Sequence, residues 1–341
     1  MLTLEEKEGV IGYSPLMDYP GFDFIKGVPV DWMHQICIGV IKKMLPLTFQ
    51  VGDTKRRATK RKLSSPKLFN DIMQKQKVPK EFSRRGRNLD LKVMKAEEFR
   101  NLILFFFPII LACIDGQSDT NERNLWLVMA FQIRAYVLPD TEYENVCQIQ
   151  LEYCCNRFLT LFEEIYGARH ASYNVHMMCH LKQVRERGPL TNTSTFATES
   201  YYSEMRRSYV AGTASTGKQL LQNAFIKRQL PHRKCHKNII YHPKDTRMSC
   251  NKYFYVFQNN AYTFYIIKEI CDDGAYKCVR QGRRQYKPAE NSHLNWESVG
   301  VFLISAIDES EEKKFYKNEI TGKAIVVMNF IITCPSNVLK E

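Results

Sequence analysis

The stretch Asp31-Trp-Met-His-Gln-Ile-Cys-Ile-Gly-Val-Ile-Lys-Lys-Met44 sets the helical pattern of this sequence. Its apolar residues recur at intervals of three and four, which places them on one face of a helix. Asp31 stands where an N-cap belongs, directly before the first turn. We therefore predict one amphipathic helix from Asp31 to about Leu45, with an apolar face formed by Met33, Ile36, Cys37, Val40, Ile41 and Met44.

More helical patterns follow, whereas residues 1–30 predict an irregular lead-in because Gly and Pro interrupt every period. The most apolar run, 102–114, predicts a buried core helix kinked at Pro108. The predicted helices cover approximately 95–114, 121–138, 141–166, 173–187 and 198–210. Their end signals are Thr120 and Asp140 as N-caps and Gly167 and Gly188 as C-terminal stops.

After about residue 235 the sequence changes to aromatic and β-branched runs, which are typical of strands. Turn signals such as Asp272-Asp-Gly274 separate the runs. Several short strands within about 90 residues predict a small antiparallel barrel or sandwich, joined to the helical part by a basic linker near 232–244. The predicted strands are 253–257, 262–267, 299–304 and 324–328.

The composition indicates a folded protein with a polyanionic partner. Hydrophobic residues make up 44% of the 341 residues, which is within the globular range. Lys and Arg number 49 against 36 Asp and Glu, and the net charge of +13 favours nucleic acid before an acidic membrane. The run 102–114 is shorter than the roughly 18 residues of a membrane span, so no membrane role is expected.

The cysteines and the start of the chain indicate a reducing compartment. The 11 cysteines follow no regular spacing, and Met1-Leu-Thr-Leu begins no signal-peptide pattern. We expect reduced thiols, in the nucleus or cytosol. The sequence shows no Gly-rich phosphate loop, Ser-His-Asp arrangement or nucleophile elbow, so nothing supports a kinase, dehydrogenase or hydrolase with a small-molecule substrate.

Residues 52–92 carry much of the excess positive charge and few apolar anchors, which predicts a loosely ordered basic loop. Clustered Lys and Arg favour contact with phosphates, although a solvated charge run or a localisation signal has the same composition. The candidate nucleic-acid-binding residues are Lys55, Arg56, Arg57, Lys60, Arg61, Lys62, Arg84, Arg85 and Arg87.

Two pairs of side chains and one glutamate could bind a metal. His176 and His180 are four residues apart, so a helix places both imidazoles on one face; the alternative is a pair of ordinary helical histidines. Asp31 and His34 lie one turn apart and could hold a cation or each other, whereas the simpler interpretation is an N-cap beside a histidine. Glu199 could be a hard oxygen ligand or an ordinary residue of the first helical turn.

Three segments together carry a resemblance in order and spacing. They are Gly27-Val-Pro-Val-Asp-Trp-Met-His-Gln-Ile-Cys-Ile-Gly-Val-Ile-Lys-Lys43, Lys95-Ala-Glu-Glu-Phe-Arg100, and Asn174-Val-His-Met-Met-Cys-His-Leu181 followed by Gly188-Pro-Leu190 and Phe196-Ala-Thr-Glu-Ser200. The chain resembles the transposase-derived proteins of the CACTA (En/Spm) type over roughly residues 10–230, and the Asp-x-Met-His helix is the most distinctive part.

The resemblance implies an RNase H-like core with a DDE triad and a helical insertion before the Glu. By this resemblance Glu199 is the third carboxylate of the triad, Asp31 and His34 form the family's Asp-x-x-His motif, and His176 and His180 are the histidine half of a zinc site. In relatives the Cys-x-x-Cys half and both triad aspartates lie upstream, and this sequence does not contain them. Cleavage through bound Mg²⁺ needs several carboxylates, so it is expected only in a complete enzyme.

These observations predict an α+β fold of three regions: the lead-in 1–30, a helical insertion with part of an RNase H-like transposase core over 31–234, and a small antiparallel β-barrel-like domain over 235–341. The expected function is nuclear DNA binding by a catalytically incomplete transposase remnant, with DNA, a full-length transposase or another nuclear protein as partner and Zn²⁺ in an incomplete site. One alternative is a domesticated nuclear protein-interaction module without DNA chemistry. Another is a decayed reading frame.

Overall fold

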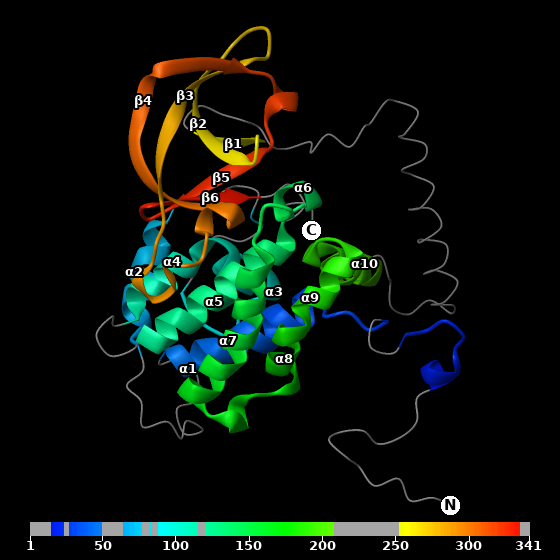
Figure 1. Cartoon of the computed structure of the whole chain (residues 1–341). Helices are drawn as coiled ribbons and strands as arrows, with labels where there is room; N and C mark the ends of the chain where they lie inside the picture. Colours follow the sequence, from blue (N-terminus) through cyan, green and yellow to red (C-terminus); the bar gives the residue numbers. More distant parts are fainter. Residues whose placement is uncertain are drawn as a thin grey trace, which may run out of the picture.

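A computed structural model describes residues 15–23, 27–49, 64–76, 82, 88–114, 120–207 and 252–334 of the chain. Helices form the first part of the described chain, and a closed antiparallel β-barrel forms the last part (Figure 1). The strands follow the order β1-β2-β3-β4-β6-β5, and β5 pairs back with β1. The expected mixture of helices with a small antiparallel barrel is therefore confirmed.

The first helix begins with the predicted N-cap. The Asp31 carboxylate accepts the Met33 backbone N–H at 2.9 Å, and a π-helical segment, η2 (Trp32–Ile41), continues directly into α1 (Lys42–Thr48). The helix therefore extends slightly beyond the expected end near Leu45. Ile36 and Val40 are buried, as the apolar spacing predicted, whereas Met33 is only partly buried and Trp32, which that spacing did not include, is fully buried.

A short helix interrupts the basic stretch, so the prediction of a loosely ordered loop over 52–92 is wrong for this part. Helix α2 (Pro66–Lys75) starts at Ser65, whose hydroxyl accepts the Lys67 N–H at 3.3 Å. Phe69 and Met73, four residues apart, bury the apolar side of α2. These two residues are the apolar anchors that the high density of charge hid in the sequence.

The core helices contain two breaks. The run 102–114 is buried as predicted except at Ala112 and Cys113, and it divides at Phe106, where a π-helical segment gives way to a helix with Pro108 in its first turn. The single helix predicted over 141–166 is two helices, because the chain turns between Tyr143 and Gln148. The elements are α3 (Ala96–Asn101), η4 (Leu102–Phe106), α4 (Phe107–Cys113), α5 (Thr120–Val137), α6 (Asp140–Tyr143) and α7 (Gln148–Tyr166).

Two of the four predicted helix ends are confirmed. Gly167 and Gly188 follow the last helical residues with φ of 85° and 90°, a conformation that favours glycine. The two predicted N-caps are wrong by one residue or more, since Thr120 already lies inside α5 and Pro139 is the N-cap of α6. The residues after Gly167 form η5 (Ala168–His170), α8 (Tyr173–His176), η6 (Met177–His180), α9 (Leu181–Val184), η7 (Arg185–Arg187), η8 (Leu190–Thr193) and α10 (Phe196–Arg207).

The barrel contains all four predicted strands and two that the pattern missed, β3 and β6. Strand β3 is rich in Lys and Arg and lacks an aromatic or β-branched run, whereas β6 has such a run but is only five residues long and follows β5 after two residues. The strands are β1 (Tyr253–Gln258), β2 (Ala261–Ile270), β3 (Tyr276–Gln285), β4 (Val301–Phe315), β5 (Gly322–Val327) and β6 (Phe330–Cys334).

The barrel and the helices share one hydrophobic core. Trp296, in the connection between β3 and β4, is fully buried and stacks on Phe107 at 5.6 Å between ring centroids. The edge of Phe131 in α5 meets the same indole at 5.4 Å. Because the two regions bury apolar surface against each other, each stabilises the other.

A buried arginine adds polar bonds to this junction. Arg134 of α5 donates to the backbone oxygens of Leu104 at 2.6 Å and Val299 at 2.7 Å, and to the Thr333 backbone oxygen at 3.2 Å. Burial lowers the pKa of the Arg134 guanidinium to about 10, so the group remains charged at neutral pH. One side chain thus joins α5, η4, the connection between β3 and β4, and β6.

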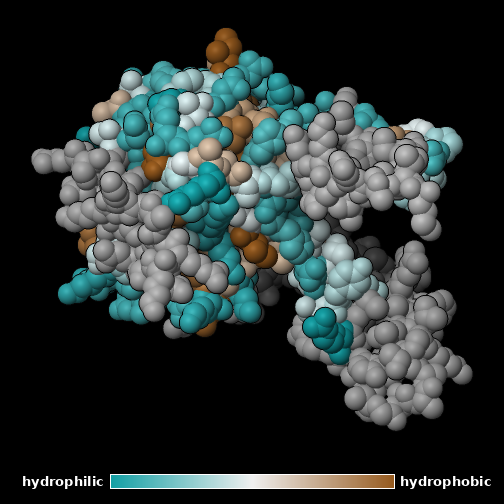
Figure 2. Space-filling model, turned by 90° about the horizontal axis from the view of Figure 1, so that it is seen from below, coloured by the Kyte–Doolittle hydropathy of each residue, from teal (hydrophilic) through white to brown (hydrophobic). Residues whose placement is uncertain are grey.

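The described part of the molecule carries no net charge. Basic and acidic residues are equal in number within it, so the whole net charge of +13 lies in the remaining segments. The end of the molecule away from the barrel shows a mosaic of hydrophilic and hydrophobic residues (Figure 2). Within the described ranges, no helix has the length and apolar character that crossing a membrane requires.

Candidate functional site

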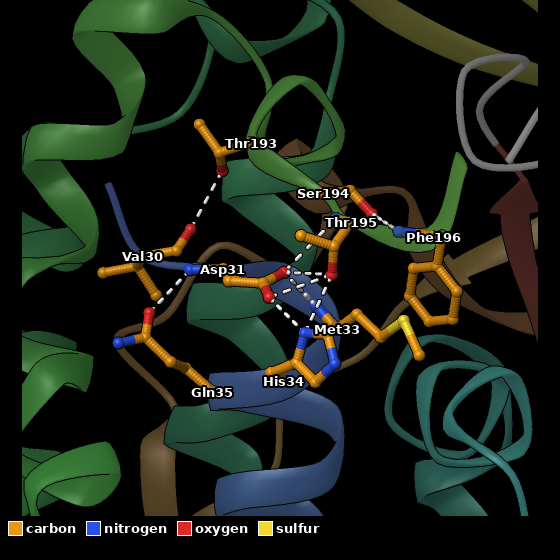
Figure 3. A network of polar contacts seen from close by, with 9 residues as sticks. All are labelled: Val30, Asp31, Met33, His34, Gln35, Thr193, Ser194, Thr195 and Phe196. Carbon is orange, nitrogen blue, oxygen red and sulfur yellow. Dashed lines mark hydrogen bonds and ion pairs between the residues drawn. The ribbon is translucent and has the colours of Figure 1, made fainter. Parts of the chain in front are cut away.

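The segments that carry the family resemblance lie against one another in the folded chain. The start of η2, the end of η8 and the start of α10 meet at Asp31 (Figure 3). Thr193 donates its hydroxyl to the Val30 backbone oxygen at 3.0 Å, across 163 residues of sequence. Residues 30–35 and 193–196, which are far apart in the sequence, thus form one continuous cluster, which we call the motif cluster.

Asp31 is the centre of the motif cluster. One carboxylate oxygen accepts the Met33 N–H, the Thr195 N–H at 3.3 Å and the Thr195 hydroxyl at 3.0 Å. The Gln35 side chain in turn accepts the Asp31 backbone N–H at 2.6 Å, which completes a reciprocal cap of the helix. Asp31 therefore caps η2 and fixes the segment before α10 with the same side chain.

Asp31 also orients His34. The second carboxylate oxygen lies 2.6 Å from His34 Nδ1, and the Thr195 hydroxyl lies 2.9 Å from the same nitrogen. Because Nδ1 faces the carboxylate, the other ring nitrogen points away from Asp31 (Figure 3). The side chain of His34 is half exposed.

Two residues from the other segments that carry the resemblance, Arg100 and Asn174, contact the elements of this cluster from two sides. Arg100, in the segment 95–100, places its guanidinium 5.0 Å from the centre of the Phe196 ring, at the start of α10. Gly39 of η2 lies against the Asn174 side chain, and a Cβ at Gly39 would come within 2.5 Å of Asn174 Nδ2. A larger residue at position 39 would therefore require the Asn174 side chain to move.

Glu199 lies one turn into α10, four residues after Thr195, and its side chain is exposed. Its backbone N–H donates to the Thr195 oxygen at 2.9 Å, so the position of Glu199 depends on the anchoring of Thr195 by Asp31. Within the described ranges, Glu199 belongs to no group of three or more neighbouring His, Cys, Asp or Glu side chains.

His176 and His180 point toward each other, as their spacing predicted. Their Nε2 atoms are 3.2 Å apart, and the rings meet edge to face at 5.1 Å between centroids. The intervening residues form a 3-10 segment rather than continuous α-helix, and this brings Cys179 to the same place. The sequence interpretation missed Cys179, although the spacing His-x-x-Cys-His was its visible signal.

The nine candidate nucleic-acid-binding residues at 55–62 and 84–87 lie outside the described residues, as does the linker 232–244. The sequence interpretation also missed Thr195, because a threonine before a helix is common and its partner is 164 residues away. Comparisons with protein-family models, curated proteins and solved structures find no match for the chain. The candidate site is therefore defined by its own contacts.

Proposed function

We propose that the chain is a transposon-derived DNA-binding protein, a remnant of a cut-and-paste transposase of the CACTA type that does not cleave DNA by itself. The observation that supports this proposal is the motif cluster, in which Asp31 bonds to Thr195, together with the contacts of Arg100 with Phe196 and of Asn174 with Gly39. Residues that resemble a family at separate places in the sequence are expected to meet in space if they serve one function.

The proposal includes a finer expectation about the fold, in which α10 is the Glu-bearing helix of an RNase H-like core. The strands that would carry two triad aspartates have no counterpart in the described ranges, where the sheet is the C-terminal barrel. A two-metal phosphoryl transfer site needs several carboxylates around its ions. Within the described ranges Glu199 joins no group of three or more ligating side chains, which supports the part of the proposal that this chain does not cleave DNA alone.

The distribution of charge indicates which residues would bind DNA. Phosphate contacts by Lys and Arg supply most of the sequence-independent affinity for DNA. The described part is neutral overall, and several of its basic residues are paired, as Lys277 is with Glu312 at 3.2 Å and Arg280 is with Glu311 at 3.1 Å. The affinity should therefore come from basic residues outside the described ranges, and we assign it to the basic clusters at 55–62 and 84–87.

Salt-titrated binding of the whole chain to duplex DNA tests the proposal. We expect a steep fall of the association constant with salt, and a slope that decreases by roughly 0.9 for each phosphate contact removed. Replacing Arg84, Arg85 and Arg87 by Ala should weaken binding and reduce the slope. The matched control replaces Lys277, Arg280 and Arg283 by Ala, the same change of charge at residues that already pair with glutamates, and should have the smaller effect.

Two results would contradict the proposal. Absence of measurable binding at low salt would favour a protein-interaction module, in which the basic clusters serve only nuclear import. Cleavage of terminal-repeat DNA by the purified chain with Mg²⁺, lost in Glu199→Gln, would show that the chain is a complete enzyme.

A further inference from the structure

His176, Cys179 and His180 form a compact group at the surface of the helical region. Their three ligating atoms all lie within 4.8 Å of one another, and within the described ranges this is the group of His, Cys, Asp and Glu that could hold a metal ion. His176 is exposed and the other two are half-buried, so the group can be reached from solvent. The proposed DNA binding does not involve these three side chains.

The local backbone explains why three ligands gather here. His176 ends α8, and η6 continues as a 3-10 helix with about three residues per turn. In such a helix residue i+3 lies almost directly above residue i, so Cys179 comes over His176. His180 follows in the same turn, with its ring against His176.

The distances fit a tetrahedral cation. Zn²⁺ binds imidazole nitrogen at about 2.0–2.1 Å and thiolate at about 2.3 Å, which separates two nitrogen ligands by roughly 3.3 Å. The observed separation of the two Nε2 atoms is 3.2 Å. The Cys179 thiol now donates to the His176 backbone oxygen at 3.0 Å, so it would have to leave that bond to reach the cation.

We propose that His176, Cys179 and His180 bind one borderline-soft transition-metal ion such as Zn²⁺, with Cys179 as the thiolate ligand. The family resemblance implies a different ligand set, with both thiolates from an upstream Cys-x-x-Cys. Here a cysteine between the histidines supplies the sulfur, and the site needs no residue from elsewhere to reach three protein ligands. The fourth position stays open for water or another ligand, as in zinc sites that exchange ligands.

The Cys179 thiol and the Gln183 side chain both affect metal binding. Partial burial raises the pKa of the Cys179 thiol, so the free thiol is protonated, and metal binding releases this proton to solvent. The Gln183 side-chain nitrogen lies 3.4 Å from His180 Nδ1. Metal binding through His180 Nε2 requires the Gln183 amide to flip, so that its oxygen accepts the Nδ1–H.

The test uses the full chain, reduced and freed of metal, titrated with Co²⁺ and then with Zn²⁺. We expect one strong site with the absorption spectrum of tetrahedral cobalt and a sulfur-to-cobalt charge-transfer band. Cys179→Ser should remove this band and weaken Zn²⁺ binding by at least roughly tenfold, since even residues that only support a ligand contribute roughly 10- to 100-fold to affinity. His176→Asn should weaken binding to a similar degree.

The sequence offers a matched control. His232-Arg-Lys-Cys-His236 repeats the spacing His-x-x-Cys-His outside the described residues. Cys235→Ser should therefore leave the cobalt band and the Zn²⁺ affinity unchanged. Far-UV circular dichroism of each variant without metal separates loss of a ligand from loss of the fold, because the proposal requires the apo variants to keep the helical spectrum.

Three outcomes would overturn the proposal: a cobalt band that persists in Cys179→Ser, a band lost in Cys235→Ser, or no binding of Co²⁺ by the folded wild-type chain. None of these outcomes depends on DNA. The proposal of a metal site can therefore be refuted while the proposal of DNA binding stands, and the proposal of DNA binding can be refuted while the proposal of a metal site stands.

Discussion

Replacing Arg134 by Met removes the polar link between the helices and the barrel while keeping a long apolar side chain in its place. Arg134 is 2% exposed and donates to the backbone oxygens of Leu104, Val299 and Thr333, and to the Thr333 hydroxyl at 3.2 Å. Methionine fills much of the same space but donates nothing. The substitution therefore tests the hydrogen bonds more than the packing.

The expected loss of stability is large. A buried carbonyl left without a donor costs about 1–3 kcal/mol, and three lose this donor. Removal of the buried charge offsets part of this loss of stability, because desolvation of an ion in a protein costs several kcal/mol. We expect the loss at the three carbonyls to outweigh this gain, with a net loss of about 3–5 kcal/mol.

Unfolding by guanidinium, followed by tryptophan fluorescence and far-UV circular dichroism, measures this loss. All three tryptophans are buried, and Trp296 at the junction reports on the barrel contact. The control is Arg157→Met, which removes an exposed pair with Glu164 at 3.5 Å and should cost less than about 1 kcal/mol. If the free energy of unfolding of Arg134→Met lies within about 1 kcal/mol of the wild-type value, the reasoning is refuted.

Two further variants test the barrel and the motif cluster. Burial raises the pKa of the Glu142 carboxyl, while hydrogen bonds from Tyr262 and Tyr255 oppose the shift. Its folded pKa thus lies above the unfolded value of about 4.3, so the stability that it adds is complete below that pH and is lost as pH rises through the folded pKa. The unfolding midpoint of Glu142→Gln minus that of wild type should therefore become more positive as pH rises from acid to neutral, and a difference that stays constant or falls would contradict this. Thr195→Val removes the hydroxyl that contacts Asp31 and should cost about 1–2 kcal/mol and speed hydrogen exchange in the first turn of α10; unchanged exchange there would show that Asp31 does not anchor this helix.

Local signals predicted those elements whose residues act on near neighbours. The Asp31 cap contacts Met33 two residues away, and the apolar face of η2 follows from a repeat of three and four residues. Gly167 ends its helix because its own φ of 85° suits glycine. The four recognised strands carry their signal in the side chains of each strand itself.

Long-range contacts decided the elements that the sequence interpretation missed or misjudged. The predicted helix 141–166 breaks after α6. In α6 the Glu142 carboxylate accepts hydrogen bonds from the hydroxyls of Tyr255 and Tyr262 in the barrel, which lie 113 and 120 residues away in sequence. Strand β3 is a strand because β2 and β4 pair with it on both sides, although its own residues are rich in Arg and Lys. Neither partner can be seen from the segment alone.

The candidate sites divide in the same way. The spacing of His176 and His180, the presence of Glu199 and the position of the basic clusters are properties of the sequence by itself. The union of Asp31 with Thr195, and of Cys179 with the two histidines, came only from the tertiary structure. A periodic pattern fixes which residues share one face of a helix, but hydrogen bonds across 164 residues and a change from α to 3-10 winding depend on how the whole chain packs.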